Sequence, residues 1–184
     1  IMTGKLEPTN SPYAMAKLSA IEIGDAISKE LGHNIKNLMP TNLYGPNDHF
    51  SANDSHVIPG LIFRMHEAKK NKDSSFKIWG SGKPLREFLY VDDLATAINT
   101  IIEENPEENI INVGSGEEVS INDLATLIKK TINYEGSLEF DSSMPDGNPR
   151  KLLDSTTIKN LGWKPKIHLE EGLNITYNWF LKKG

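Results

Sequence analysis

Segments with the pattern of β-strands alternate with segments that have the pattern of α-helices, and this alternation limits the possible folds more than any other feature of the chain. The predicted helices cover residues 11–31, 56–70, 92–102, 121–132, 155–161 and 169–181. The predicted strands cover residues 35–39, 76–79, 86–90, 109–113 and 137–141. Such alternation is typical of α/β proteins, and 184 residues are enough for one sizeable core or two small ones. The sequence therefore predicts an α/β fold.

Short-range signals mark the ends of two helices. Ser11 is the expected N-cap of the first helix, Pro12 its first helical residue and Gly32 its C-terminal cap. Ser120, followed three residues later by Asp123, resembles a capping box at the start of another helix.

A hairpin followed by a helix is predicted in the middle of the chain. Residues 76–79 alternate like a strand, residues 80–84 contain the Gly and Pro of a turn, and residues 86–90 have the pattern of a returning strand. Asp92 or Asp93 is then expected to cap the next helix.

The composition excludes several classes of protein. The net charge is −5, and no block of Lys and Arg is long enough to favour nucleic acid or a membrane surface as a partner. No apolar run approaches the ~20 residues of a membrane span, and we expect no signal peptide. The absence of cysteine excludes disulfides and thiolate chemistry within the chain. We expect a cytoplasmic protein without a metal site.

Tyr13 and Lys17 are four residues apart on the first predicted helix, so their side chains share one face. A neighbouring ammonium favours the phenolate and lowers the pKa of a tyrosine from its usual value near ~10. The pair is therefore suited to donating a proton to a carbonyl that is being reduced. By itself this spacing is a weak signal, because a surface tyrosine beside a solvated lysine gives the same pattern.

A long polar loop is predicted over residues 41–55, directly after the first strand and Pro40. Loops of this length in compact domains are usually functional or disordered. Thr41 and Asn42 offer hydrogen-bond donors and acceptors to a ligand, while Pro and Gly fix the backbone path. A Pro/Gly loop without a ligand is the alternative.

His56 opens the helix after this loop, in a partly exposed place where an imidazole can exchange protons near neutral pH. A lone histidine is more often structural than catalytic. Arg64 follows eight residues later, about two helical turns on, so it is expected to project from a similar face. A guanidinium there can hold a diphosphate through two parallel hydrogen bonds.

The predicted hairpin brings Trp79 and Arg86 close together, and an aromatic plane beside a cation suits a purine nucleotide with its phosphates. The glycines at its turn are not a dinucleotide fingerprint, because no G-x-G-x-x-G follows. Asp146 and Lys151 belong to a later Pro/Gly-rich stretch, for which a simple turn is the alternative interpretation.

Six motifs occur in an order that resembles the extended short-chain dehydrogenase/reductases, which form the NAD-dependent epimerase/dehydratase family. They are S-P-Y-A-M-A-K (11–17), M-P-T-N-L-Y-G-P (39–46), S-H-V-I-P (55–59), W-G-S-G-K-P-L-R-E-F-L-Y-V-D-D (79–93), N-V-G-S-G (112–116) and P-D-G-N-P-R-K (145–151). The second, third and sixth motifs are similar to those of the family members that make GDP-L-fucose.

The resemblance implies an NADP(H)-dependent enzyme that epimerises and reduces GDP-4-keto-6-deoxy-D-mannose to GDP-L-fucose. It implies that Tyr13 protonates the C-4 oxygen, that Lys17 tunes Tyr13 and holds the nicotinamide ribose, and that His56 supplies a proton during epimerisation. By the same resemblance, the cofactor contacts Lys17, Pro40, Thr41, Asn42, Leu43 and His56. The GDP-sugar contacts Arg64, Trp79, Arg86, Asp146 and Lys151.

The resemblance also implies two domains. Residues 1–43 and 92–112 are expected to complete a Rossmann sheet, and residues 44–91 and 113–184 to form a smaller substrate-binding domain. The family's Gly-rich phosphate loop and its catalytic Ser and Cys belong upstream of Ile1. The chain is therefore expected to be a C-terminal fragment that is inactive alone and binds NADPH poorly. A homodimer through the Tyr13 helix is expected as well.

Two other functions stay open. One is a related NAD-dependent nucleotide-sugar 4-epimerase or 4,6-dehydratase, which shares the Tyr13/Lys17 pair and the motif over residues 79–93. The other is a non-catalytic domain that binds a sugar nucleotide.

Overall fold

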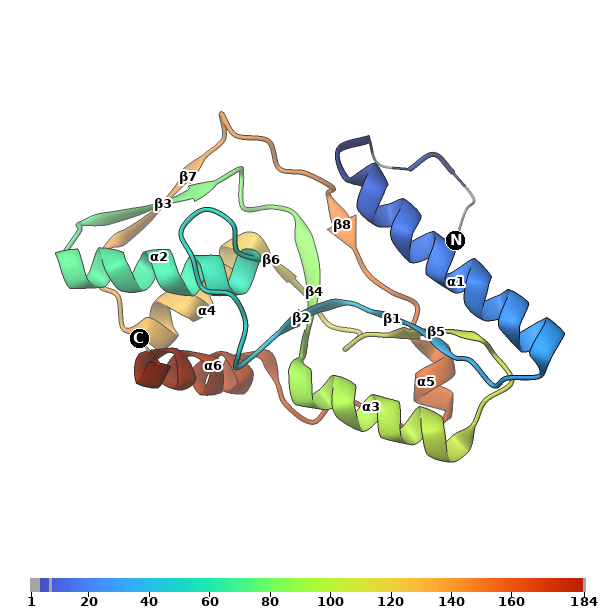
Figure 1. Ribbon diagram of the computed structural model, residues 1–184. Coiled ribbons are helices and arrows are strands. Elements are labelled where there is room, and N and C mark those ends of the chain that lie inside the picture. Colours follow the sequence, from blue (N-terminus) through green and yellow to red (C-terminus); the bar gives the residue numbers. More distant parts are fainter. Residues whose placement is uncertain (1–3, 7, 184) are drawn as a thin grey trace.

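The computed structural model describes residues 4–6 and 8–183, and Figure 1 shows α1 at one end of the molecule and α2, β3 and β7 at the other. The helices are η1 (Pro8–Asn10), α1 (Ser11–Leu31), α2 (Val57–Asn71), α3 (Val91–Glu104), α4 (Ile121–Ile132), α5 (Thr156–Asn160) and α6 (Leu169–Lys183). The strands are β1 (Asn37–Pro40), β2 (Asn42–Tyr44), β3 (Ser75–Trp79), β4 (Leu85–Tyr90), β5 (Ile110–Val113), β6 (Glu118–Ser120), β7 (Ser137–Asp141) and β8 (Arg150–Lys151). The predicted α/β class is confirmed.

Parallel pairing dominates the sheets. β1 pairs in parallel with β5, β2 with β4, and β3 with β7. β4 also pairs with β6, which is antiparallel to it, and with β8, which is parallel to it, so this sheet has four strands. Only Thr41 separates β1 from β2, so the chain passes from one sheet to the next in a single step.

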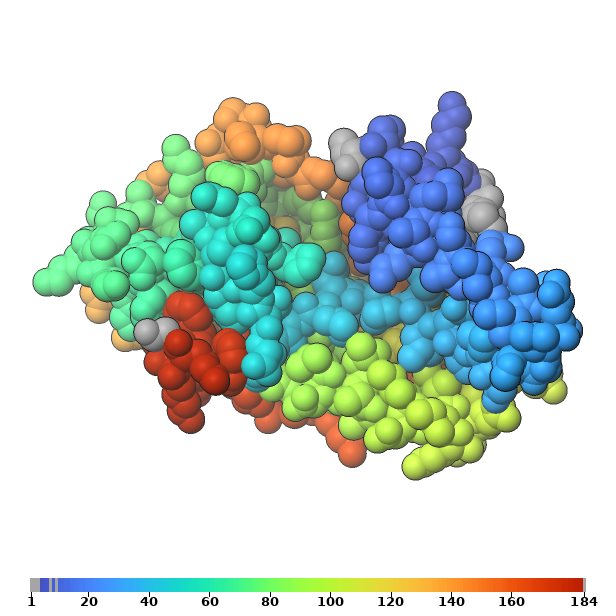
Figure 2. Space-filling model, in the orientation of Figure 1, coloured from blue at the N-terminus to red at the C-terminus, as the bar shows by residue number. Residues whose placement is uncertain are grey.

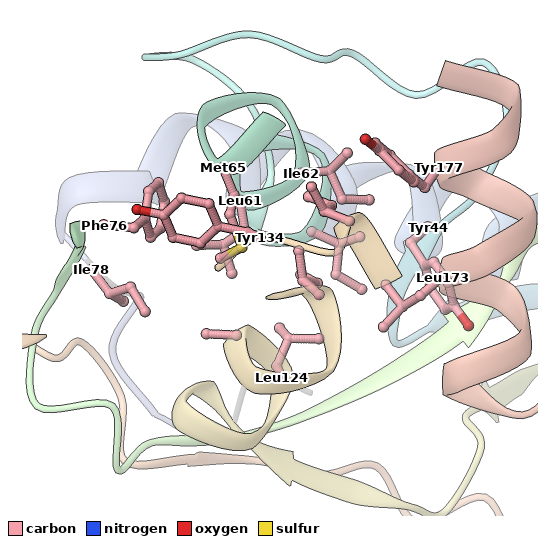
Figure 3. Packing of buried hydrophobic residues seen from close by; sticks show 14 of the residues in the cluster. Tyr44, Leu61, Ile62, Met65, Phe76, Ile78, Leu124, Tyr134, Leu173 and Tyr177 are labelled. Atoms are coloured by element: carbon pink, nitrogen blue, oxygen red, sulfur yellow. The ribbon is translucent and has the colours of Figure 1, made fainter. Parts of the chain in front are cut away.

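The first hydrophobic core lies between α2, α4 and α6, as Figure 3 shows. Apolar residues recur along α2 and α4 at the helical spacing of three and four, so each helix turns one stripe inward. Ile62 and Met65 of α2, Leu124 of α4 and Leu173 of α6 have no exposed surface. This packing holds α2 against α4 and the C-terminal helix.

A second core lies under β1 and β5. Ala97, Ile111, Val113 and Ile158 are fully buried there, and Trp163 packs against them. Ile158 and Trp163 come from the C-terminal part of the chain, although the rest of their core comes mainly from α3 and β5. The division into residues 1–43 with 92–112 and residues 44–91 with 113–184 stays a prediction.

Helix ends follow the local sequence in most places. Gly32 caps α1 with φ 71°, and Ser120 caps α4 by accepting a hydrogen bond from the Asp123 N–H. The predicted cap of α1 is wrong by one residue, because Asn10 takes that position and Ser11 is the first helical residue. At the start of α3, long-range contacts of Asp93 override the other predicted cap.

Asp92 and Asp93 lie inside the first turn of α3, and Tyr90 takes the cap position, so the predicted cap there is wrong. The Asp93 carboxylate, which is 2% exposed, accepts hydrogen bonds of 3.0 Å from the backbone N–H groups of Lys166 and Ile167. A buried carboxylate is stabilised by such donors. Asp93 therefore ties the segment before α6 to α3.

The predicted hairpin is wrong. The turn after β3 is present, with φ 84° at Gly80, but β3 pairs with β7 and β4 pairs with β2, β6 and β8. The Gly80 N–H continues the pairing of β3 with β7 by donating to Asp141 O at 2.9 Å. After Gly80 the chain enters β4 of another sheet and does not return alongside β3. Three short strands, β2, β6 and β8, form in segments where none was predicted.

In the part of the chain that the structure describes, no helix is long and apolar enough to cross a membrane.

Candidate active site

A cleft with a volume of about 1110 Å³ opens between α1, the β1–β2 connection and the start of α2. Figure 2 shows it as a recess between the blue surface of α1 and the teal surface around residues 45–58. The predicted site residues that line it are Tyr13, Pro40, Thr41, Asn42, Leu43, His56 and Lys151. Ligands of parallel α/β sheets bind outside the carboxyl ends of the strands, and β1 and β2 both end here.

Tyr13 stands near the start of α1 with 60% of its surface exposed, so its hydroxyl is accessible from the cleft. Lys17 Nζ lies 5.4 Å from the centre of the Tyr13 ring. The helical spacing of four therefore places the phenol and the ammonium side by side.

Thr41 and Asn42 line the cleft, and both side chains are hydrogen-bonded to the backbone of Glu87. Thr41 Oγ1 donates to Glu87 O at 3.2 Å, and Asn42 Nδ2 donates to the same oxygen at 2.8 Å. The Thr41 N–H donates to Val113 O at 3.0 Å. These bonds take up one donor of each side chain and leave the oxygens of both as acceptors for a ligand.

His56 takes the N-cap position of α2, with an extended backbone (φ −63°, ψ 167°). Its carbonyl accepts the Gly60 N–H at 2.9 Å, which ties its backbone to the first turn of the helix. The side chain is exposed and lines the cleft, where it is open to a ligand or to water.

A second group of predicted residues lies outside the cleft lining. The Arg64 guanidinium stacks on two rings, 5.3 Å from the centre of Trp79 and 5.4 Å from that of Phe76. Burial lowers the pKa of Arg64. Trp79 is 56% exposed, so one face of the stacked pair is open to an aromatic ligand. Arg64 thus turns toward β3, and not into the cleft with His56 as its helical spacing predicts.

Asp146 holds the turn that follows Trp79. Its carboxylate accepts hydrogen bonds from the Ser81 N–H at 2.6 Å and the Ser81 hydroxyl at 2.8 Å. The backbone bond and then the side-chain bond lower the pKa of this carboxyl. A Cβ on Gly80 would lie 2.5 Å from Asp146 Oδ1, so only glycine allows this approach. The turn expected at Asp146 as an alternative is not formed: the turn residues lie at 142–143, and Asp146 lies in irregular chain that bonds to Ser81.

Arg86 and Lys151 lie opposite each other on β4 and β8, and Lys151 also lines the cleft. They are register partners in the parallel pair of β4 and β8, so their side chains leave the sheet on the same face. Arg86 Nη1 donates to Leu85 O at 2.7 Å, and Lys151 lines the cleft. A nucleotide diphosphate lying across these two strands would meet both cations.

The sequence motifs predicted no role for Glu87, which the structure places at the centre of several backbone contacts. It has no exposed surface, and its carboxylate accepts the Gly116 N–H at 2.6 Å and the Leu153 N–H at 3.2 Å. Its carbonyl accepts the bonds from Thr41 and Asn42. A charged residue beside the apolar Phe88 and Leu89 in a strand was the available signal.

The residues of the cleft fit one end of a nicotinamide dinucleotide. An exposed phenol, a neighbouring ammonium and backbone at the ends of two parallel strands suit a nicotinamide and its ribose. The chain contains no G-x-G-x-x-G loop for the pyrophosphate, so the fit is limited to the nicotinamide end.

The parallel α/β fold, the Tyr13/Lys17 pair and the cleft at the carboxyl ends of β1 and β2 are typical of nucleotide-dependent oxidoreductases and epimerases. Residues 1–114 match the model of the NAD dependent epimerase/dehydratase family, and the chain belongs to this family. It is 48% identical over 182 residues to a probable GDP-L-fucose synthase 1 of Oryza sativa subsp. japonica and 46% identical over 191 residues to the GDP-L-fucose synthase of Escherichia coli (strain K12).

Each of these alignments covers 99% of the chain, and the chain spans 56% of the rice protein and 60% of the bacterial protein. The fold is similar to a solved GDP-L-fucose synthetase from Naegleria fowleri bound to NADP, with a TM-score of 0.90 and 30% identity. That alignment covers 99% of this chain and 59% of the Naegleria chain.

Proposed function

We propose that the chain is the C-terminal part of an NADPH-dependent enzyme that converts GDP-4-keto-6-deoxy-D-mannose to GDP-L-fucose. The observation that carries the proposal is that one cleft gathers Tyr13, His56 and Lys151 from α1, the start of α2 and β8. The names of the rice, bacterial and Naegleria relatives support the same substrate and cofactor.

Two chemical steps require two proton donors. In the first step, the carbons beside the C-4 ketone lose and regain protons, and His56 supplies a proton on one face of the sugar. In the second step, Tyr13 gives its hydroxyl proton to the C-4 oxygen as the ketone is reduced. NADPH, held beside Thr41, Asn42 and Leu43, would supply the hydride for C-4. Lys17 lies beside the Tyr13 ring, where its charge stabilises the phenolate that remains.

The GDP part of the substrate extends from the cleft across β4 and β8. Arg86 and Lys151 bind the diphosphate, and the exposed Trp79, supported by Arg64, stacks on the base. Asp146 supports this surface through its bonds to the turn after Trp79. In this proposal, residues 1–43 with 92–112 belong to the cofactor domain, and residues 44–91 with 113–184 belong to the substrate domain.

The decisive assay uses the full-length gene product with NADPH and GDP-4-keto-6-deoxy-D-mannose. The expected result is consumption of NADPH and formation of GDP-L-fucose, identified by mass and by the stereochemistry of the released sugar. Inversion at C-4 of another nucleotide sugar, with no net use of NADPH, would replace the proposal with a 4-epimerase. Binding of GDP without turnover would replace it with a non-catalytic sugar-nucleotide-binding domain.

We also propose a cytoplasmic homodimer that pairs through α1. The helix buries only Ile21 and Gly24 against the rest of the chain, and Met15, Ile23 and Leu31 are exposed hydrophobic residues on it. Light scattering of the full-length gene product should give twice the monomer mass, and a monomer at micromolar concentration contradicts the pairing.

A further inference from the structure

The connection between β2 and α2 lines the cleft at both of its ends. Asn47 and Asp48 lie at its start, and His56 lies at its end. The His56 side chain makes no capping hydrogen bond within the described residues, and it is exposed. The direction of its imidazole therefore depends on how the backbone before it is held.

Phe50 anchors the middle of this connection on the C-terminal helix. Its ring centre lies 5.0 Å from that of Phe180 and 5.9 Å from that of Trp179, with interplanar angles of 34° and 30°. Figure 1 shows the connection passing beside α6 before it turns into α2. Such ring distances are typical of favourable aromatic pairs.

The same helix also holds α2. Phe180 packs on Phe63 at 6.2 Å and on His66 at 5.2 Å between ring centres, and the Tyr177 hydroxyl pairs with His66 Nδ1 at 3.0 Å. α6 therefore contacts the segments on both sides of His56. Phe50 provides the contact to the segment before it.

Hydrogen bonds tie together the stretch from His49 to Ser55, which directly precedes His56. The Ser51 N–H donates to Ser55 Oγ at 2.6 Å, and that hydroxyl donates back to Ser51 O at 3.0 Å. Asp54 contacts the Ser51 hydroxyl and lies 3.2 Å from His49 Nε2. A Cβ on Gly60 would lie 3.4 Å from Ser55 Cβ, so this stretch packs closely on the first turn of α2. Phe50 and His56 are thus the residues on either side of the bonded pair Ser51 and Ser55.

We propose that Phe50 is a positioning residue: its ring, docked on Trp179 and Phe180, fixes the segment that carries His56 and aims the imidazole into the cleft. This inference rests on the proposed role of His56 in epimerisation. It adds a residue that touches neither cofactor nor substrate, and it makes the C-terminal helix part of the support of the active site.

The test compares Phe50→Ala with Phe63→Ala in the full-length gene product. Phe63 is a matched control because its ring packs on the same Phe180 but belongs to α2. Phe50→Tyr retains the ring and serves as the rescue variant. Thermal unfolding of all three establishes that they are folded before rates are compared.

The first readout is deuterium uptake from D₂O at the two carbons beside the ketone, measured without NADPH. Small misplacements of a catalytic group cost up to about 100-fold in rate. We expect Phe50→Ala to slow this exchange about 10-fold or more, and Phe63→Ala and Phe50→Tyr to stay within about threefold of wild type. Equal losses in Phe50→Ala and Phe63→Ala, or no loss in Phe50→Ala, overturn the inference.

The second readout does not require activity. The imidazole signals of His56, assigned with His56→Gln, are recorded by NMR in the wild type and the two alanine variants. A shifted or broadened His56 signal in Phe50→Ala alone supports the inference, and an unchanged signal overturns it. A wild type that neither exchanges deuterium nor oxidises NADPH contradicts the proposed function, while the NMR comparison still decides the role of Phe50.

Discussion

Tyr13 lines the cleft from the first turn of α1, and it is 60% exposed. If it protonates the C-4 oxygen, Tyr13→Phe removes the proton donor while the nucleotide-binding surface stays intact. General acid catalysis contributes about 10²–10⁴-fold, so kcat for the reduction should fall by that range with little change in KM for the GDP-sugar. NADPH oxidation measured by absorbance checks this.

Tyr134→Phe is the matched control, because it also removes one tyrosine hydroxyl. That hydroxyl donates to Asp73 O at 2.9 Å, and Tyr134 does not line the cleft. It should leave kcat unchanged. Deuterium exchange beside the ketone should persist in Tyr13→Phe, and full reductase activity in that variant would remove Tyr13 from the mechanism.

Glu87 acts through contacts that no local pattern reveals. Its carboxylate bonds to backbone 29 and 66 residues away. Glu87→Gln retains the shape but places an amide donor against one of the two N–H groups. An unsatisfied buried polar group costs about 1–3 kcal/mol, so the unfolding free energy in urea should fall by that amount.

Glu117→Gln is the control for charge, because Glu117 is exposed. It should change the unfolding free energy by less than about 0.5 kcal/mol. An equal and small effect of both substitutions would show that the Glu87 carboxylate is not a structural link.

At the scale of elements, the turn that follows Trp79 depends on the ionised form of Asp146. The hydrogen bonds from Ser81 lower the pKa of Asp146, so its stabilising contribution is present above the unfolded value near ~3.9 and is lost as pH falls through the lower folded value. The unfolding midpoint of Asp146→Ala should therefore lie below that of wild type at pH 7, and the gap should narrow as the pH drops below about 4. Urea titrations across this range measure it, and a gap that does not depend on pH contradicts it.

The sequence predicted the long helices because their signals are local. Ile62 and Met65 follow the apolar period of α2, and Gly32 and Ser120 end or begin helices through contacts within a few residues. It did not predict the partners of the strands, since the pairing of β3 with β7 joins residues about 60 positions apart. The strands β2, β6 and β8 are two or three residues long, which is too short for a period to show.

In the candidate site, too, the local contacts were predictable from the sequence and the long-range contacts were not. Tyr13 and Lys17 are neighbours because residues four apart on a helix share one face. The structure also places Tyr13 in one cleft with His56. Arg64 departs from its expected direction because Phe76 and Trp79 hold its guanidinium. That contact depends on how β3 packs on α2, which no spacing within one helix encodes.

For the whole molecule, the chain alone and the full-length gene product should differ in which ligand they bind. The residues proposed to hold GDP all lie on this chain, whereas it contains no G-x-G-x-x-G loop for the pyrophosphate of NADPH. Titration calorimetry of residues 1–184 should detect GDP binding, with no saturable NADPH binding at concentrations that saturate the full-length gene product, and no turnover. Robust NADPH-dependent turnover by these residues would refute this.

The pairing of Arg86 with Lys151 across β4 and β8 has a practical consequence for the laboratory. Two positive charges on one face of adjacent strands repel each other until an anion sits between them. Sulfate and inorganic phosphate carry the charge of the diphosphate without its base or sugar, so under the proposed binding mode each should compete with the diphosphate for Arg86 and Lys151. Assays and crystallisation trials in ammonium sulfate or phosphate buffer should therefore raise the apparent KM for the nucleotide sugar, whereas chloride at equal ionic strength should do so less.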